Sequence, residues 1–218
     1  MSSPQQLKER LAEAARYALL RRLAPALRHN MAGSLQPIGM MSSMLEKRLQ
    51  KPEPDLPALA RSSAALNTLS REGAAACMAL TAWLAPNDNE QVAFDACLEQ
   101  ALGLVNTELS FKGLTLVNET GGLTVQLPRG VVCHVVMAAL IALADVAVAP
   151  ANIVLTADQL GDELLIAITV VATHGETMPI GMTSYRGLHW DDVQALAEAE
   201  SVLLAGGAEC AELRYRLV

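Results

Sequence analysis

His29 is the side chain of this sequence best placed to do chemistry. It lies in the stretch ALRHNMAGSLQPIG, residues 26–39, within a run whose apolar residues recur at helical spacing. On a helical wheel these apolar residues form one broad stripe, and His29 points almost opposite its centre. The stripe consists of Leu19, Leu23, Leu27, Met31, Leu35, Ile38, Met41 and Leu45. We therefore expect His29 to face solvent, although an exposed helical histidine is by itself more often an ordinary surface residue.

The side chains that share the face of His29 are mostly small or polar. They are Arg22, Pro25, Ala26, Ala32, Gly33 and Gln36. Such a face leaves the imidazole open to a docking partner.

The other residues that often bind metals do not form a second site in the sequence. His134 lies in an apolar run and is expected to be a core histidine, while His174 and His189 have no cysteine or carboxylate at ligand spacing. The cysteines are far apart and show no CxxC pair, which favours buried free thiols over zinc ligands or disulfides. These cysteines are Cys77, Cys97, Cys133 and Cys210. We expect neither a metal nor another cofactor.

Composition excludes several classes of protein. With 218 residues, 52% of them hydrophobic, the chain has ample material for a core. The charged N-terminal stretch does not read as a signal peptide, and no apolar run is long enough to span a membrane, so a cytoplasmic protein is expected. Nucleic-acid binding is disfavoured because aromatic residues make up only 3% of the chain and no Lys/Arg-rich run occurs.

Charge is divided unevenly along the chain. Up to Pro86, eleven Lys and Arg residues face six Asp and Glu residues, a net charge of +5, which leaves −12 for the remainder of the total of −7. A basic N-terminal part indicates an acidic partner.

The hydrophobic pattern predicts two domains, residues 1–86 and 87–218. In the first, helical runs over about 4–49 and 57–85 flank QKPEPDLP, whose prolines predict a turn and hence a helical hairpin. Two helices cannot bury so broad an apolar stripe, so two hairpins are expected to form a four-helix bundle in a homodimer.

The second domain is predicted to be an α+β sandwich, with helices on one face of a mixed sheet. FDACLEQALGLVNTELSFKG reads as a helix, LTLVNET and LTVQLP as a strand pair across Gly-Gly, and GVVCHVVMAALIALADVA as a buried helix. Two strands turning at LGDE follow, then a helix that ends at Gly206 and Gly207, and a final strand, CAELRYRLV.

This order of elements resembles the sensor histidine kinases, in which a dimerisation and histidine-phosphotransfer hairpin precedes a GHKL-type ATP-binding domain. The local matches are LRHNMAGSLQPI, similar to the phosphoacceptor box, SFKGLTLVNE, similar to the first strand of the ATP domain, and HVVMAALIALADVA, similar to its asparagine-bearing helix. The resemblance covers residues 15–218 and makes His29 the expected phosphoacceptor.

The sequence departs from that family where the nucleotide would bind. The asparagine that holds magnesium falls at Ala142 and an earlier asparagine at Ala138, and aliphatic side chains cannot ligate a hard cation. The Asp-x-Gly-x-Gly turn falls on Thr173, Gly175 and Thr177, and the glycine-rich lid retains Gly187 alone. The resemblance therefore implies a degenerate ATPase-like domain without ATP.

The phosphoacceptor box departs too, because Asn30 stands where the family has an acidic residue that takes a proton during attack on ATP. That loss does not prevent His29 from accepting a phosphoryl group from an aspartyl phosphate. The chain thus resembles the bacterial dimeric histidine phosphotransferases, whose partner is a response-regulator receiver domain. The residues expected to contact the receiver are Arg22, Arg28, Asn30, Gly33 and Gln36. A divergent active kinase and a scaffold without phosphotransfer remain alternatives.

Overall fold

A computed structural model of the chain describes residues 3–84, 90–175 and 186–217. It contains two compact units, one formed by Met1–Ala24 with Pro86–Val218 and the other by Pro25–Ala85. The first is an α+β sandwich and the second is helical, so the predicted fold class is confirmed. The boundary inside the first helix differs from the predicted division at residue 86, and each unit is described by itself.

The helical unit is a hairpin made of the second half of α1 (Pro4–Leu49) and α2 (Leu56–Leu84). Asp55 begins α2 as its cap, because its carboxylate accepts a hydrogen bond from the backbone N–H of Ala58 at 3.0 Å. Arg48 donates to the Ser62 hydroxyl at 2.7 Å and joins the two helices. Gly73 lets them approach closely, since a Cβ there would lie 2.9 Å from Cδ1 of Ile38.

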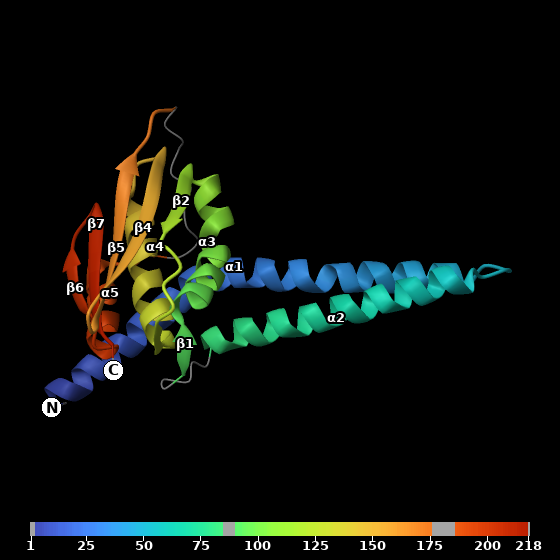
Figure 1. The fold of residues 1–218 in the computed structure, drawn as a ribbon, viewed down its shortest axis with the longest axis horizontal. Helices are drawn as coiled ribbons and strands as arrows, with labels where there is room; N and C mark the ends of the chain where they lie inside the picture. The colour runs from blue at the N-terminus through green and yellow to red at the C-terminus, as the bar shows by residue number, and fades with distance from the viewer. Residues whose placement is uncertain (1–2, 85–89, 176–185, 218) are drawn as a thin grey trace. The chain divides into compact units, whose positions relative to one another are not determined.

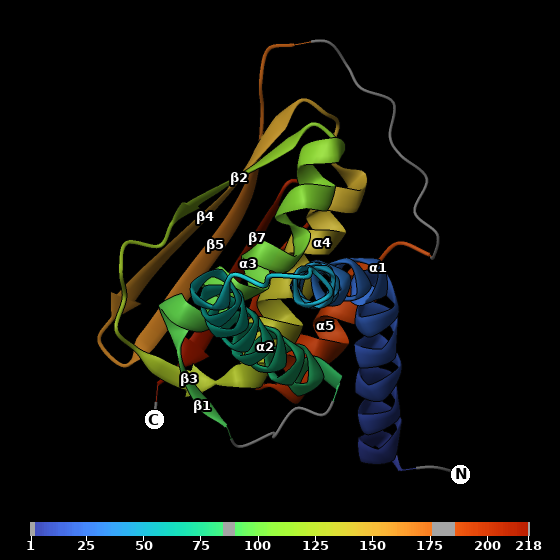
Figure 2. The ribbon, with the colours of Figure 1, turned by 90° about the vertical axis from the view of Figure 1, so that its right-hand side faces the viewer.

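The sandwich unit has a five-stranded sheet in the order β2-β4-β5-β7-β6, with β2 parallel to β4 and the other pairs antiparallel. Figures 1 and 2 show α3, α4 and α5 on one face of this sheet. The helices are α3 (Phe94–Phe111), η1 (Val131–Val136), α4 (Met137–Val146) and α5 (Trp190–Ala199). The strands are β1 (Gln91–Ala93), β2 (Leu114–Glu119), β3 (Gln126–Pro128), β4 (Ala151–Leu160), β5 (Glu163–Ala172), β6 (Leu203–Gly206) and β7 (Cys210–Arg216).

The predicted strand pair across Gly121 and Gly122 is wrong. β2 instead lies parallel to β4, with Leu114 opposite Ala151, and β3 pairs with β1 in a separate two-stranded sheet. Both glycines have positive φ, near +75°, but they do not form a tight hairpin turn. The partner of β2 is distant in the sequence, and no local turn signal reports such a pairing.

The predicted end of the last helix is also wrong, because α5 ends at Ala199 rather than at the Gly206–Gly207 pair. Ser201 has a φ of +57°, which a helix does not accommodate, and the chain then enters β6. Gly206 and Gly207 instead begin the turn between β6 and β7. The glycine pair therefore ends a strand.

The apolar run predicted as a buried helix is confirmed, although its first part, η1, is a π-helix. His134 lies in η1 as a buried core histidine, and its Nδ1 donates to Oε1 of Glu200 at 2.9 Å. Arg16 of α1 donates to the same oxygen at 3.2 Å. Burial alone would raise the pKa of Glu200, but the bonds and charges of His134 and Arg16 hold that pKa below its usual range.

The first 24 residues belong to the sandwich unit because one side of this part of α1 is fully packed. Its buried apolar residues are Ala12, Ala15, Ala18, Leu19 and Leu23. Small side chains at helical spacing allow a helix to approach its neighbours closely.

Gly130→Ala tests the packing around Glu200. A Cβ at Gly130 would overlap the Glu200 carboxylate, so this carboxylate must leave His134 and Arg16. We expect a loss of about 1–3 kcal/mol in the free energy of unfolding, measured by urea denaturation. Gly103→Ala is the matched control, because it adds a Cβ to α3 in open space and should stabilise by about 0.5–1 kcal/mol. Equal effects of the two variants would contradict this account.

Candidate functional site

His29 is exposed on α1 within the helical unit, as the wheel predicted. Arg28 beside it is exposed, and Asn30 is half-buried, with its backbone carbonyl accepting a bond from the Ser34 hydroxyl at 3.0 Å. Pro25 precedes His29 by one helical turn, and α1 is nevertheless continuous through it. The imidazole is therefore held on a regular helix and is open to a macromolecular partner.

The face that carries His29 continues along α1 at helical spacing. Gly33 and Gln36 follow at positions i+4 and i+7, and both are exposed. A Cβ at Gly33 would meet no atom within 4 Å. Further along, a shallow hollow is lined by Gln36, Gly39, Met40, Ser43, Met44 and Lys47. Small residues and flexible methionines give this face a shape to which another protein surface can adapt.

Arg22 does not share this exposure, and its predicted role as a receiver contact is corrected. Its side chain is only 6% exposed and lies in the sandwich unit. It donates to Oε2 of Glu108 at 2.9 Å and to Oδ1 of Asp145 at 2.8 Å. A receiver could reach this guanidinium only if two buried ion pairs broke. Arg22 is therefore a structural residue.

Lys112 completes a largely buried cluster of two cations and two carboxylates. Its Nζ lies 2.9 Å from Oδ1 of Asp145 and 3.3 Å from Oε1 of Glu108. Burial would raise the pKa of both carboxyls, but bonds and charges from Arg22 and Lys112 outweigh it and keep each pKa below its usual range. Burial likewise opposes the charge on Arg22, yet Glu108 and Asp145 raise its pKa. Arg22, Glu108 and Asp145 are therefore charged at neutral pH.

The position aligned with the magnesium-holding asparagine, Ala142, and the position aligned with the earlier asparagine, Ala138, lie on α4 beside this cluster. Ala138 and Ala142 are buried, and Asp145 follows them at i+7 and i+3, so the three share one face of α4. Because Asp145 pairs with Arg22, α1 lies against that face. These positions therefore offer hydrocarbon side chains and a carboxylate already paired with Arg22 and Lys112, whereas a magnesium ion needs free oxygen ligands.

The aligned adenine-binding turn retains little recognisable chemistry. Thr173 is exposed and its backbone N–H donates to the carbonyl of Pro150 at 2.9 Å, while Gly175 lies against the Pro150 ring. Thr177 lies outside the described residues. Gly187 borders Asp145, from which a Cβ would be 3.5 Å away.

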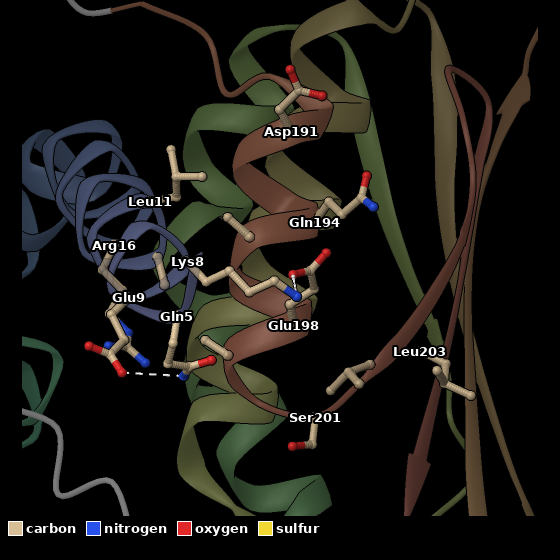
Figure 3. Close-up of a pocket in the computed structure, with 14 residues that line it drawn as sticks. Gln5, Lys8, Glu9, Leu11, Arg16, Asp191, Gln194, Glu198, Ser201 and Leu203 are labelled. Carbon is tan, nitrogen blue, oxygen red and sulfur yellow. Dashed lines mark hydrogen bonds and ion pairs between the residues drawn. The ribbon is translucent and has the colours of Figure 1, made fainter. Parts of the chain in front are cut away.

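A groove in the sandwich unit lies between the start of α1, α5 and β6 (Figure 3). Both cations among its described lining residues are held by carboxylates, since Lys8 lies 3.1 Å from Glu198 and Arg16 pairs with Glu200. Figure 3 shows Lys8 reaching across the groove to Glu198. The groove therefore does not present the unpaired positive charge that a nucleotide phosphate requires.

Within residues 3–84, 90–175 and 186–217, no three histidine, cysteine, aspartate or glutamate side chains are grouped so that they could hold a metal ion. No helix in the same ranges is both long and apolar enough to cross a membrane.

Sequence reasoning missed the cluster around Arg22, although one signal was present. Asp145 closes an otherwise apolar helix, and a carboxylate so placed needs a cationic partner. The identity of that partner was not readable, because Arg22 lies 123 positions away.

Neither a protein-family model nor a curated protein sequence matches the chain. Several solved structures are similar to the chain. The histidine kinase AdeS of Acinetobacter baumannii is 16% identical with a TM-score of 0.44, over 81% of this chain and 94% of that one. A histidine kinase from Burkholderia phymatum STM815 is 16% identical with a TM-score of 0.44, over 90% and 97%. A bacterial phosphotransferase is 16% identical with a TM-score of 0.39, over 90% and 94%. At these values the likeness does not assign a function to this chain.

Arg22→Met tests whether Arg22 supports the fold. The substitution leaves Glu108 and Asp145 with Lys112 as their remaining cation, so we expect a loss of about 3 kcal/mol in the free energy of unfolding. Arg28→Met, the same change at an exposed position, should stay within about 0.5 kcal/mol. Urea denaturation of both variants measures the difference.

The pH dependence of stability, compared between the wild type and Arg22→Met, is a second readout. Because folding lowers the pKa of Glu108 and Asp145, their contribution is present above their unfolded pKa and is lost as pH falls through the folded values. The wild type should lose stability below about pH 4, and the gap between it and Arg22→Met should narrow there. A gap independent of pH would argue against the ion pairs.

Proposed function

We propose that this chain is a histidine phosphotransfer protein of two-component signalling, in which His29 exchanges a phosphoryl group with the aspartate of a receiver domain. The observation that carries the proposal is a contrast between the two units. His29 is exposed on a face of small and polar residues, whereas Ala142, at the aligned magnesium position, and Ala138, at the earlier asparagine position, are buried hydrocarbon. The phosphoacceptor is thus kept while the means of loading it from ATP is lost.

The proposed reaction needs little from the protein beyond His29. A neutral imidazole nitrogen attacks the phosphorus of the receiver's aspartyl phosphate, a P–N bond forms, and the P–O bond breaks as the aspartate leaves with its electron pair as a carboxylate. The mixed anhydride is already activated, so the absence of a carboxylate at Asn30 is not an obstacle. The receiver domain supplies the magnesium ion and most of the other catalytic groups. The reverse reaction loads the receiver.

The other predicted partner residues contribute to this proposal in different ways. Arg28, adjacent and exposed, offsets phosphoryl charge and attracts the acidic pocket of a receiver. Gly33 and Gln36 allow close approach along the helix face below His29, and half-buried Asn30 lies beside them.

A homodimer is part of the proposal because the hairpin leaves apolar surface uncovered. On the predicted stripe, Met31 is 38% exposed and Leu35 is 46% exposed, while Ile38, Met41 and Leu45 are half-buried. A second hairpin would cover the stripe in a four-helix bundle that displays two copies of His29.

Phosphotransfer is tested by incubating the chain with a panel of phosphorylated receiver domains and, separately, with labelled ATP and magnesium. We expect label on the wild type from at least one receiver and none from ATP. His29→Gln should lose all label, and His174→Gln, which changes an exposed histidine of the sandwich unit, should retain it.

Each alternative function predicts a different pattern of label. Labelling of His29 by ATP would show a divergent kinase. Receiver binding without label on either histidine variant or the wild type would show a scaffold and overturn the proposal.

The dimer is tested by Leu35→Glu, which places a charge on the exposed part of the stripe. We expect the chain to shift from dimer to monomer in light scattering, because the carboxylate cannot be buried in an apolar bundle core. Leu56→Glu is the control, since Leu56 is 72% exposed at the start of α2 and should leave the mass unchanged. A monomeric wild type would contradict this part of the proposal.

A further inference from the structure

Cys97 and Cys133 lie in contact inside the sandwich unit, although the sequence predicts isolated thiols. Their Sγ atoms are 3.8 Å apart, and the side chains are 5% and 3% exposed. Cys97 belongs to the first turn of α3 and Cys133 to η1, 36 positions later. The fold has therefore brought two thiols from different helices together.

The two thiols are not equivalent. The hydrogen bond between the two thiols lowers the pKa of Cys97 against the opposing effect of burial, and the nearby positive charge of Arg129 lowers it further. The same hydrogen bond, together with burial, raises the pKa of Cys133. Cys97 also lies at the positive end of α3, a position that favours a thiolate.

Two charged groups, Arg129 and Glu90, act on the pair. Arg129 faces both sulfurs and is held by Glu90, whose Oε2 lies 2.8 Å from its Nε. Glu90 opposes the thiolate on Cys97. The balance of these charges sets which sulfur is the nucleophile.

We propose that Cys97 and Cys133 form an oxidative modification site, at which a peroxide converts the dithiol into a disulfide within the chain. Cys97 is the attacking sulfur and Cys133 the resolving one. A peroxide is the fitting class of oxidant because it is small and uncharged and the sulfurs are nearly buried.

The reaction balances with one equivalent of hydrogen peroxide. The Cys97 thiolate attacks one oxygen, the O–O bond breaks, hydroxide leaves, and Cys97 becomes a sulfenic acid. The Cys133 sulfur then attacks the Cys97 sulfur, the S–O bond breaks, and the thiol proton leaves with the hydroxyl as water. Both sulfurs are oxidised, the peroxide is reduced, and two water molecules form once the first hydroxide takes up a proton.

Closure requires only a local movement. The sulfurs must approach from 3.8 Å to about 2.05 Å, within the reach of side-chain rotation combined with a small shift of η1. The bond would tie the start of α3 to the helix that leads into α4. Such a link raises stability chiefly by restricting the unfolded chain.

The test treats the folded chain with hydrogen peroxide, blocks the remaining thiols, and maps disulfide-linked peptides by mass spectrometry. We expect a Cys97–Cys133 linked peptide in the wild type, with the loss of two hydrogen atoms, and a melting temperature that rises and returns on reduction. In Cys133→Ser, dimedone should trap a sulfenic acid at Cys97; in Cys97→Ser, Cys133 should remain largely unmodified. Exposed Cys210 monitors the oxidant in every sample.

A matched pair of charge variants tests the assigned roles. Arg129→Gln should slow the trapping of Cys97 in the Cys133→Ser background, whereas Glu90→Gln should speed it, because one removes the favourable charge and the other the opposing one. Oxidation of Cys210 without a Cys97–Cys133 link in the folded wild type would overturn the proposal. Preferential trapping of Cys133 would also overturn it, because the roles would be reversed.

Discussion

The sandwich unit depends on one buried cluster of charges. Asp145 is the residue before the last in α4, a helix that is otherwise wholly apolar, and a carboxylate in that position must be paired. Arg22 and Lys112 provide the cations, with Glu108 as the second anion, and together they join α1, α3 and α4. This need explains why the part of α1 up to Ala24 packs with the sandwich. Removing one partner leaves an unpaired charge inside the protein, so the stability of each group depends on the other three.

The same cluster bears on function through the face of α4 that it covers. Ala138, Ala142 and Asp145 share that face, and α1 contacts it through Arg22. A lobe arranged in this way supports the proposal that the domain has a structural or binding role and that phosphoryl groups come from another protein. His29 then needs only exposure and a neutral nitrogen. Both requirements are simpler than those of a kinase, which must also hold a nucleotide.

Local signals in the sequence predicted much of the fold. The turn between β4 and β5 and the buried histidine His134 were both predicted from neighbouring residues. What failed was non-local: the parallel pairing of β2 with β4, the contact of Cys97 with Cys133, and the burial of Arg22. The wheel placed Arg22 on the face of His29, but it could not show that another part of the chain covers that face. For His29, the helical wheel alone correctly predicted that the side chain is exposed.

The central claim is that His29 exchanges phosphate with a receiver and not with ATP. Its most direct test starts from the opposite end of the reaction: the chain is phosphorylated on histidine with phosphoramidate, and loss of phosphohistidine is followed after adding receiver domains with magnesium. The account predicts that a cognate receiver discharges His29 rapidly and gains the phosphoryl group, while ADP with magnesium leaves the phosphohistidine intact. Discharge of His29 by ADP to give ATP, or a phosphohistidine that every receiver leaves intact, would contradict it.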